Sequence, residues 1–101
     1  MNFKKVYFIV GGVNSKDWEN IIKILPKNYY YLLCQPNIEI KMNVSLLSKI
    51  FRYHNLNHKN FKSTSLAFNY INSIAKKDDL IFVGGSLFVV SEFFQEWERK
   101  N

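Results

Sequence analysis

The chain has 101 residues and a mass of 12.0 kDa, which is enough for one domain with a modest core and too little for two. Its composition, 48% hydrophobic and 17% aromatic, excludes a disordered tail, and its single cysteine, Cys34, excludes an intrachain disulfide and a cysteine-rich zinc site. The net charge of +6 suits an anionic partner, but the lysines are scattered, and AT-rich codons alone would enrich lysine, asparagine, isoleucine and phenylalanine. Charge therefore does not favour specific nucleic-acid binding.

The apolar segments are too short for a signal peptide or a membrane helix. Residues 6–10 form a run of five, and residues 80–90 form a run of eleven that is interrupted by Gly-Gly-Ser. A membrane-spanning helix needs about 20 apolar residues. We expect a cytoplasmic protein that does not enter a membrane.

Apolar runs and helical spacings alternate along the chain. Continuous apolar runs predict strands that are covered on both faces, and apolar residues three or four apart predict amphipathic helices. In chain order the sequence predicts a strand at 6–10, a helix from about 16, a strand at 29–34 and a helix capped by Asn43. A weak strand near 60–62 follows, and then a helix capped by Ser63 or Thr64 with Lys76 and Lys77 in its last turn. A strand at 80–83 and a final helix complete the chain.

This order predicts the fold class. Strands that alternate with amphipathic helices form a parallel sheet with right-handed crossovers and helices on both faces. We expect an α/β fold, a three-layer α/β/α Rossmann-like domain with a mainly parallel sheet.

Two glycine-containing loops are candidates for a binding site. Residues 11–17 and 84–86 each follow a predicted strand and precede a predicted helix. Ligands of open parallel sheets bind outside the carboxyl ends of the strands, where helix N-termini can bind anions. Ordinary strand-to-helix turns also favour glycine and serine. Neither loop matches G-x-G-x-x-G or the phosphate-binding G-x-x-x-x-G-K-[ST] motif.

Three other features have simpler explanations than chemistry. His54 and His58 have a spacing that could share a metal, but a loop-forming Asn-Leu-Asn separates them and favours surface histidines. Cys34 is expected to be a small buried residue at a strand end. Asp78 and Asp79 are expected to lie in a turn.

Two motifs resemble one enzyme family. Residues 79–92, DLIFVGGSLFVVSE, are similar to the closing motif of folylpolyglutamate and dihydrofolate synthases, in which a strand is followed by Gly-Ser, an apolar run and a glutamate. Residues 12–17, GVNSKD, resemble the strand-end motif of that family, which ends in Asp-Lys-Asp. The resemblance extends over residues 3–95.

The resemblance implies a part of a larger enzyme. Members of the family are ATP-dependent amide ligases of the Mur ligase superfamily, which activate a carboxylate of folate or dihydropteroate and join it to glutamate. The chain resembles only their Rossmann-like C-terminal domain, without its opening strand and helix. We therefore expect residues 1–101 to form a single domain that is inactive alone. ATP and Mg²⁺ would bind the complete enzyme, and the resemblance assigns no catalytic residue and no metal ligand to this chain.

The resemblance also implies positions for site residues. Ser86 would lie near the amino-acid substrate, and Lys16 and Asp17 would line the cleft between domains. Loop backbone would be supplied by Gly12, Gly84 and Gly85. The sequence departs from the family at Ser15, where an aspartate is usual, and at Ile40, where an arginine often binds carboxylate.

The missing opening strand has a consequence for strand order. In the family the final strand lies between the opening strand and the strand at 6–10, so the order here would be 4-1-2-3. The strand that begins at Leu80 and ends at Val83 would then be an exposed apolar edge, prone to self-association or to pairing with another chain. The alternative function, which the departures at Ser15 and Ile40 favour, is a non-catalytic binding or interaction module with decayed ligase ancestry.

Overall fold

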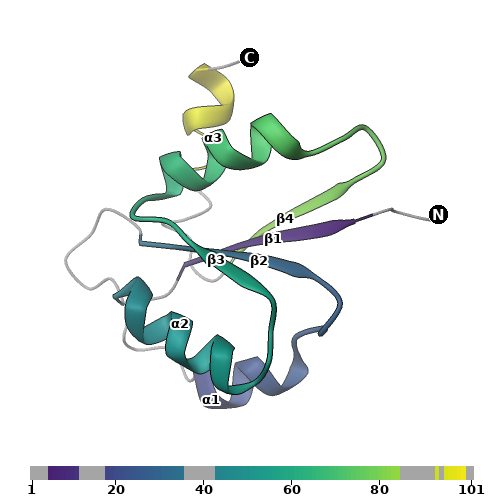
Figure 1. Ribbon diagram of the computed structural model, residues 1–101. Coiled ribbons are helices and arrows are strands. Elements are labelled where there is room, and N and C mark those ends of the chain that lie inside the picture. Colours follow the sequence, from purple (N-terminus) through teal and green to yellow (C-terminus); the bar gives the residue numbers. More distant parts are fainter. Residues whose placement is uncertain (1–4, 12–17, 36–42, 85–92, 94, 100–101) are drawn as a thin grey trace.

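A computed structural model of the chain describes residues 5–11, 18–35, 43–84, 93 and 95–99 (Figure 1). Its strands are β1 (Val6–Gly11), β2 (Tyr30–Cys34), β3 (His58–Asn60) and β4 (Leu80–Gly84). Its helices are α1 (Trp18–Ile21), the 3₁₀ turn η1 (Ile22–Ile24), α2 (Val44–Tyr53) and α3 (Thr64–Ile74), and residues 95–99 are also helical.

The four strands form one sheet in which every neighbouring pair is parallel. The order is β3-β2-β1-β4, which is the predicted 4-1-2-3 counted from the other edge. Strand β1 lies in the middle, with Ile9 opposite Leu32 of β2 and opposite Val83 of β4. The predicted fold class and strand order are confirmed.

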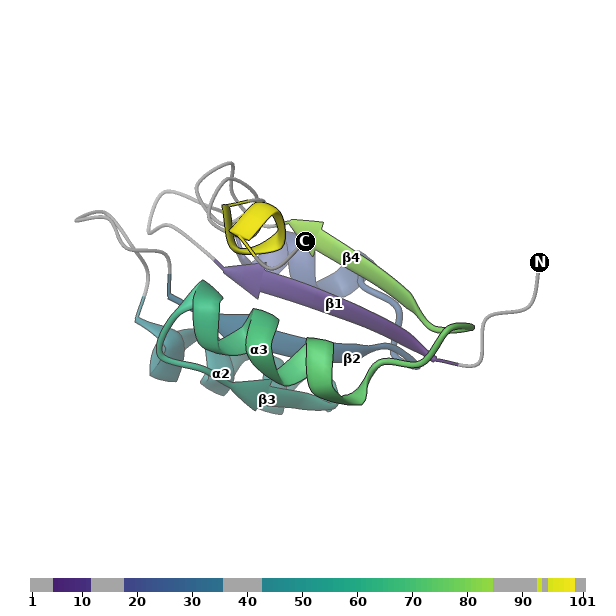
Figure 2. The same ribbon diagram turned by 90° about the horizontal axis from the view of Figure 1, so that it is seen from above.

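Helices cover both faces of the sheet (Figures 1 and 2). Helices α1 and α2 cover one face, and α3 covers the other. None of the helices in the described part of the chain is long and apolar enough to cross a membrane. Two apolar clusters fill the layers: Val10, Trp18, Ile22, Tyr31, Leu33, Leu47, Phe51 and Leu56 on the first face, and Tyr7, Ile9, Leu32, Cys34, Ala67 and Ile71 on the second.

The two longer helices begin at the predicted caps. The Asn43 side chain accepts a hydrogen bond from the Ser45 N–H at 2.7 Å, and the Ser63 hydroxyl accepts one from the Leu66 N–H at 3.1 Å. The predicted end of α3 is wrong. The helix ends at Ile74, before Lys76, because the Asp79 carboxylate accepts the Lys76 N–H at 2.8 Å and closes a turn.

Strand β3 lies two residues earlier than predicted, at His58–Asn60. The reason is the sharp end of α2, where Asn55 has φ 59°. The Leu56 N–H donates to the Phe51 carbonyl and the Asn55 N–H donates to the Arg52 carbonyl, both at 3.0 Å, which is a Schellman motif. This cap turns the chain at once, so that His58 already lies opposite Tyr31.

Candidate functional site

The carboxyl ends of β1 and β4 lie side by side. Val10 of β1 is opposite Gly84 of β4, and Gly11 is opposite Cys34 of β2. Because the strands are parallel, the two glycine-containing loops leave the same edge of the sheet from neighbouring strands. The structure thus brings together the starting points of the two predicted loops. Five predicted site residues lie outside the described residues, and their roles stay predictions: Gly12, Lys16, Asp17, Gly85 and Ser86.

Gly84 is the one predicted site residue that the structure describes, and a packing contact already restricts it. A Cβ atom at this position would lie 3.2 Å from the ring of Phe8. The Phe8 ring is itself held between Tyr31 and Phe82, at centroid distances of 5.9 and 5.8 Å. The glycine therefore has a structural reason that is independent of any ligand.

Polar side chains at this end of the sheet already serve the fold. Gln35 follows β2, and its Oε1 atom accepts the N–H of Val44, the first residue of α2, at 2.8 Å. The Cys34 Sγ atom lies 3.6 Å from the hydroxyl of Thr64, the first residue of α3, and both residues are buried. Cys34 is fully buried at a strand end, as predicted. The role of Gln35 was missed, although a polar residue directly after a strand is a recognisable signal.

Trp18 begins α1 directly after the first loop. Its side chain is 5% exposed, and its indole N–H is buried with no hydrogen-bond acceptor among the residues that the structure describes. The residues that the structure describes include no cluster of three or more His, Cys, Asp or Glu side chains that could hold a metal ion. The described part of this end thus offers an N–H donor, which suits an anionic group, and not the ligand set that Mg²⁺ prefers.

The histidines do not form a metal pair. His58 lies on β3, where its Nε2 accepts the Ser48 hydroxyl at 2.8 Å and its Nδ1–H donates to the Leu56 carbonyl at 2.8 Å. This tautomer follows because a carbonyl only accepts. Both ring nitrogens are occupied by the fold, so no lone pair is left for a metal. The interpretation as a surface histidine is wrong for His58, which is half-buried and connects α2 to β3.

A hollow lies at the opposite end of the sheet, where the strands begin. It has a volume of about 310 Å³ and lies between the sheet and α3. Burial raises the pKa of the Tyr7 phenol in its wall, so this hydroxyl keeps its proton at neutral pH. Sequence reasoning missed the hollow, because its tyrosines belong to runs that strand packing explains. It is lined by Tyr7, Tyr30, Tyr31, Leu32, Asn57, His58, Lys59, Tyr70 and Ile74.

Comparison with known proteins points to one kind of enzyme, although no family model matches the chain. The dihydrofolate synthase/folylpolyglutamate synthase of Buchnera aphidicola subsp. Schizaphis graminum is 29% identical over 100 residues, which are 95% of this chain and 23% of that protein. The chain thus spans about a quarter of the length of the curated relative that it matches.

Solved structures agree on the fold. The bifunctional folylpolyglutamate synthase/dihydrofolate synthase of Yersinia pestis c092, complexed with AMPPNP and Mn ion, matches 93% of this chain with 22% of its own, at a TM-score of 0.79 and 18% identity. E. coli FolC in complex with ADP matches 99% of this chain with 24% of its own, at a TM-score of 0.82 and 18% identity. The chain is therefore similar, over nearly all of its length, to about a quarter of a folylpolyglutamate/dihydrofolate synthase.

Proposed function

We propose that the chain belongs to the C-terminal domain of an ATP-dependent ligase that joins glutamate to folate or dihydropteroate. The observation that carries the proposal is that sequence similarity and fold similarity point to the same enzymes and cover 95% and 99% of the chain. In such an enzyme the domain completes the amino-acid and nucleotide sites that the remaining domains begin. ATP and Mg²⁺ would be held mainly by those other domains.

The loops after β1 and β4 would carry this role. They start from neighbouring parallel strands, because Val10 is opposite Gly84, so their residues can act on one ligand. We propose that Ser86 contacts the amino-acid substrate and that Lys16 and Asp17 line the cleft toward the nucleotide. The indole N–H of Trp18, directly after the first loop, has no acceptor among the described residues, which supports an anionic group beside it.

A chimeric enzyme tests the proposal. The segment of the Buchnera enzyme that matches this chain is replaced by the chain, and ATP-dependent incorporation of glutamate is measured against the enzyme that lacks the segment. We expect the chimera to be active and Ser86→Ala to lower its activity by about tenfold or more, the cost of a hydrogen bond to a charged group.

The matched control in this experiment is Ser73→Ala. The Ser73 hydroxyl donates to the Tyr70 carbonyl at 2.6 Å in the exposed last turn of α3, which lies toward the end of the sheet where the strands begin. We expect this variant to keep the activity of the chimera. A folded chimera without activity would contradict the proposal.

The alternative is a non-catalytic binding or interaction module, which the departures at Ser15 and Ile40 favour. Titration of the isolated chain with ATP–Mg²⁺ and, separately, with glutamate distinguishes the two. Binding of either ligand that is lost in Asp17→Ala or Ser86→Ala supports the ligase role. Absence of heat with both ligands, together with an inactive chimera, supports the module.

We further propose that the chain pairs through β4, either with a second copy or with a segment of another chain. Within the described residues β4 pairs only with β1, and it is an apolar strand whose Ile81 and Phe82 are 36% and 40% exposed. Light scattering over a dilution series should show self-association that Ile81→Lys weakens. Leu46→Lys, at a 50% exposed position of α2, is the matched control. A monomer at every concentration contradicts self-association.

A further inference from the structure

The hollow at the amino end of the sheet has aromatic walls. Tyr7 of β1 and Tyr30 of β2 contact each other on the sheet side, with ring centroids 5.6 Å apart. Tyr70 lines the hollow on the helix side, and its ring contacts Phe61 at 5.2 Å. Tyr30 is 39% exposed, so part of its ring remains available to a ligand. The walls therefore suit a flat, apolar group of small size.

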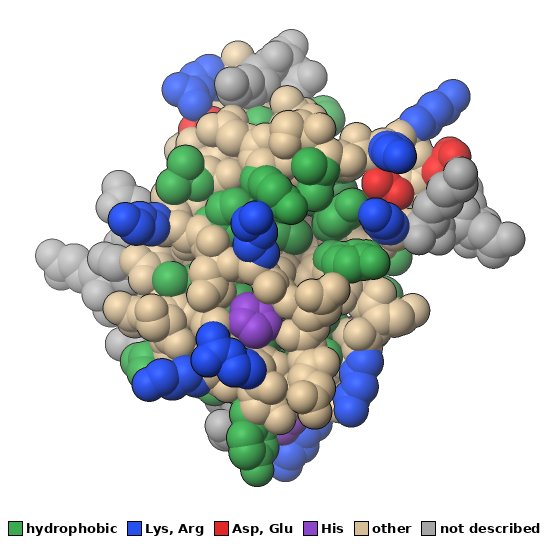
Figure 3. Space-filling model, in the orientation of Figure 1, with side chains coloured by type: hydrophobic (Ala, Val, Ile, Leu, Met, Phe, Trp, Pro, Cys, Tyr) green, Lys and Arg blue, Asp and Glu red, His purple; other side chains and the backbone are tan. Residues whose placement is uncertain are grey.

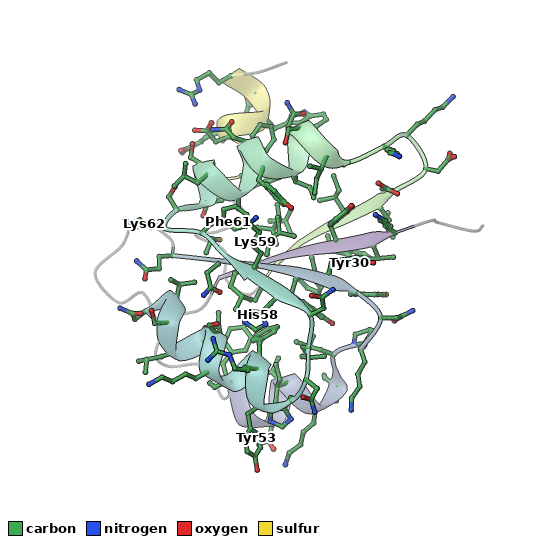
Figure 4. The ribbon with its side chains drawn as sticks, in the orientation of Figure 1. Tyr30, Tyr53, His58, Lys59, Phe61 and Lys62 are labelled. Carbon is green, nitrogen blue, oxygen red and sulfur yellow. The ribbon has the colours of Figure 1, made fainter. Side chains whose placement is uncertain are left out.

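A lysine stands over each side of this hollow. The Lys59 ammonium lies 4.7 Å from the centre of the Tyr70 ring, and the Lys5 ammonium lies 5.6 Å from the centre of the Tyr30 ring. Figure 4 shows Lys59 on β3 between Tyr30 and Phe61. Of these two lysines only Lys59 lines the hollow. One cation in an aromatic site matches a ligand with a single negative charge.

None of the described residues that line the hollow carries a carboxylate that would oppose such a ligand. Asp79 acts on Tyr7 from outside this lining, where its carboxylate accepts the Lys76 N–H. His58 lines the hollow, yet both of its ring nitrogens are bonded to Ser48 and Leu56. Among the described lining residues, Lys59 is thus the cationic side chain that a ligand would meet.

The part of the sequence that contains most of the lining residues is basic. Between residues 20 and 77 the sequence has one acidic residue, Glu39, and nine basic residues. On the face shown in Figure 3, Lys and Arg side chains are distributed widely, whereas Asp and Glu side chains lie toward the margins. Such a basic chain attracts anions to the molecule as a whole, and among the described lysines Lys59 lines the hollow. The nine basic residues are Lys23, Lys27, Lys41, Lys49, Arg52, Lys59, Lys62, Lys76 and Lys77.

We propose that the hollow is a binding site for a small aromatic carboxylate. The ring of the ligand lies against the phenol rings of Tyr30 and Tyr70, and its carboxylate meets the Lys59 ammonium. The volume of about 310 Å³ is enough for one or two fused rings. The site is separate from the loops of the proposed ligase, because Tyr30 and Lys59 lie where the strands begin and those loops follow the strand ends. The proposal does not depend on the ligase role.

Three probes test the site on the full chain by calorimetry and by two-dimensional NMR. 2-Naphthoate has the flat ring and the charge, 2-naphthalenemethanol has the ring without the charge, and cyclohexanecarboxylate has the charge without the flat ring. We expect 2-naphthoate to bind and to shift the amide signals of Tyr30, Lys59 and Tyr70. The affinity of each of the other two probes should be lower by about tenfold or more, because each lacks one of the two interactions.

Variants of single side chains then locate the binding. Lys59→Gln should weaken 2-naphthoate binding about tenfold, as expected for a charged hydrogen bond, and Tyr70→Leu should weaken it by removing a ring face. Lys62→Gln removes an exposed lysine just beyond β3 that is outside the lining and should change nothing. Lys59 is exposed, so its variant folds even if Tyr70→Leu does not. Absence of 2-naphthoate binding, equal binding of all three probes, or equal losses in Lys59→Gln and Lys62→Gln would overturn the proposal.

Discussion

The β3 edge of the sheet is three residues long and polar, whereas the β4 edge is five residues long and apolar. Side chains of α2 hold β3 in place. The Ser48 hydroxyl is hydrogen-bonded to the His58 ring, and the Phe51 ring packs on the same imidazole with ring centroids 6.0 Å apart. Strand β4 is held by its backbone pairing with β1 and by ring contacts of the half-exposed Phe82. A short polar edge discourages further pairing, and a longer apolar edge invites it. Within the described residues, a helix thus holds the β3 edge by side-chain contacts, whereas the β4 edge is a longer apolar strand that pairs only with β1.

The largest expected effect on stability concerns the side of the sheet that α2 covers. Phe51 is fully buried and contacts Trp18, Tyr31 and His58. We expect Phe51→Ala to lower the free energy of unfolding by about 3–5 kcal/mol, the usual cost of a large cavity in a core. Urea denaturation measures it, with Tyr53→Ala as control, because Tyr53 lies on the same helix and is 83% exposed. Similar losses in both variants would contradict the assignment of Phe51 to the core.

The next largest effect is expected when the hydrogen bond between α2 and β3 is removed. Ser48 is 3% exposed, and its hydroxyl donates to His58. We expect Ser48→Ala to cost about 1–3 kcal/mol, because the imidazole nitrogen loses its partner in a poorly solvated position. Urea denaturation gives the cost, and amide hydrogen exchange should show faster opening of β3. Ser45→Ala, at an exposed position of the same helix, should stay within about 0.5 kcal/mol of the parent.

A smaller effect is expected at the open side. Phe82 is 40% exposed and contacts Phe8 and Tyr29 at ring-centroid distances of 5.8 and 6.1 Å. We expect Phe82→Ala to cost about 1 kcal/mol, the value of partly exposed aromatic pairs. The comparison with Phe51→Ala in the same denaturation series isolates the difference between the two edges. A loss at Phe82 as large as the one at Phe51 would mean that β4 belongs to the core.

The last effect appears only in alkali and concerns the strand beside β3. Burial, with a smaller contribution from Tyr29, raises the pKa of Tyr31 to about 12. The unfolded chain loses this proton near pH 10, so the stabilising contribution is complete below about pH 10 and is lost as the pH rises through about 12. Unfolding free energies measured between pH 8 and pH 12 should fall less steeply for Tyr31→Phe than for the parent. Tyr30→Phe, at an exposed neighbour, should follow the parent, and equal slopes for the two variants would contradict the prediction.

Much of the fold could be predicted from the sequence. Continuous apolar runs predicted β1, β2 and β4, and Asn43 and Ser63 predicted where two helices begin. The errors arose where local hydrogen bonds decide where an element begins or ends. The bond to the Asp79 carboxylate accompanies the early end of α3, and the backbone turn at Asn55 makes β3 begin early. Such bonds depend on single residues and produce no periodic pattern.

The candidate site could be predicted only in part. The positions of the two loops followed from strand order, since both follow strands that became neighbours. The packing of Phe8 against Gly84 and the bonds of His58 depend on contacts between distant segments, which no spacing in the sequence reports. The hollow was missed for the same reason, because Tyr30 and Tyr70 are forty positions apart in the sequence and meet only when α3 crosses the sheet.

The left-handed turn at Asn55 also bears on how this sequence uses its codons. A residue with φ 59° is usually glycine, and asparagine is the common substitute. The chain has 12 asparagines and only 4 glycines, which form the pairs at 11–12 and 84–85. Asparagine has AT-rich codons and glycine has GC-rich ones. At the end of α2 the left-handed backbone conformation is therefore adopted by the residue with the AT-rich codons. Under that bias position 84 still encodes glycine, and a Cβ atom there would lie 3.2 Å from the Phe8 ring.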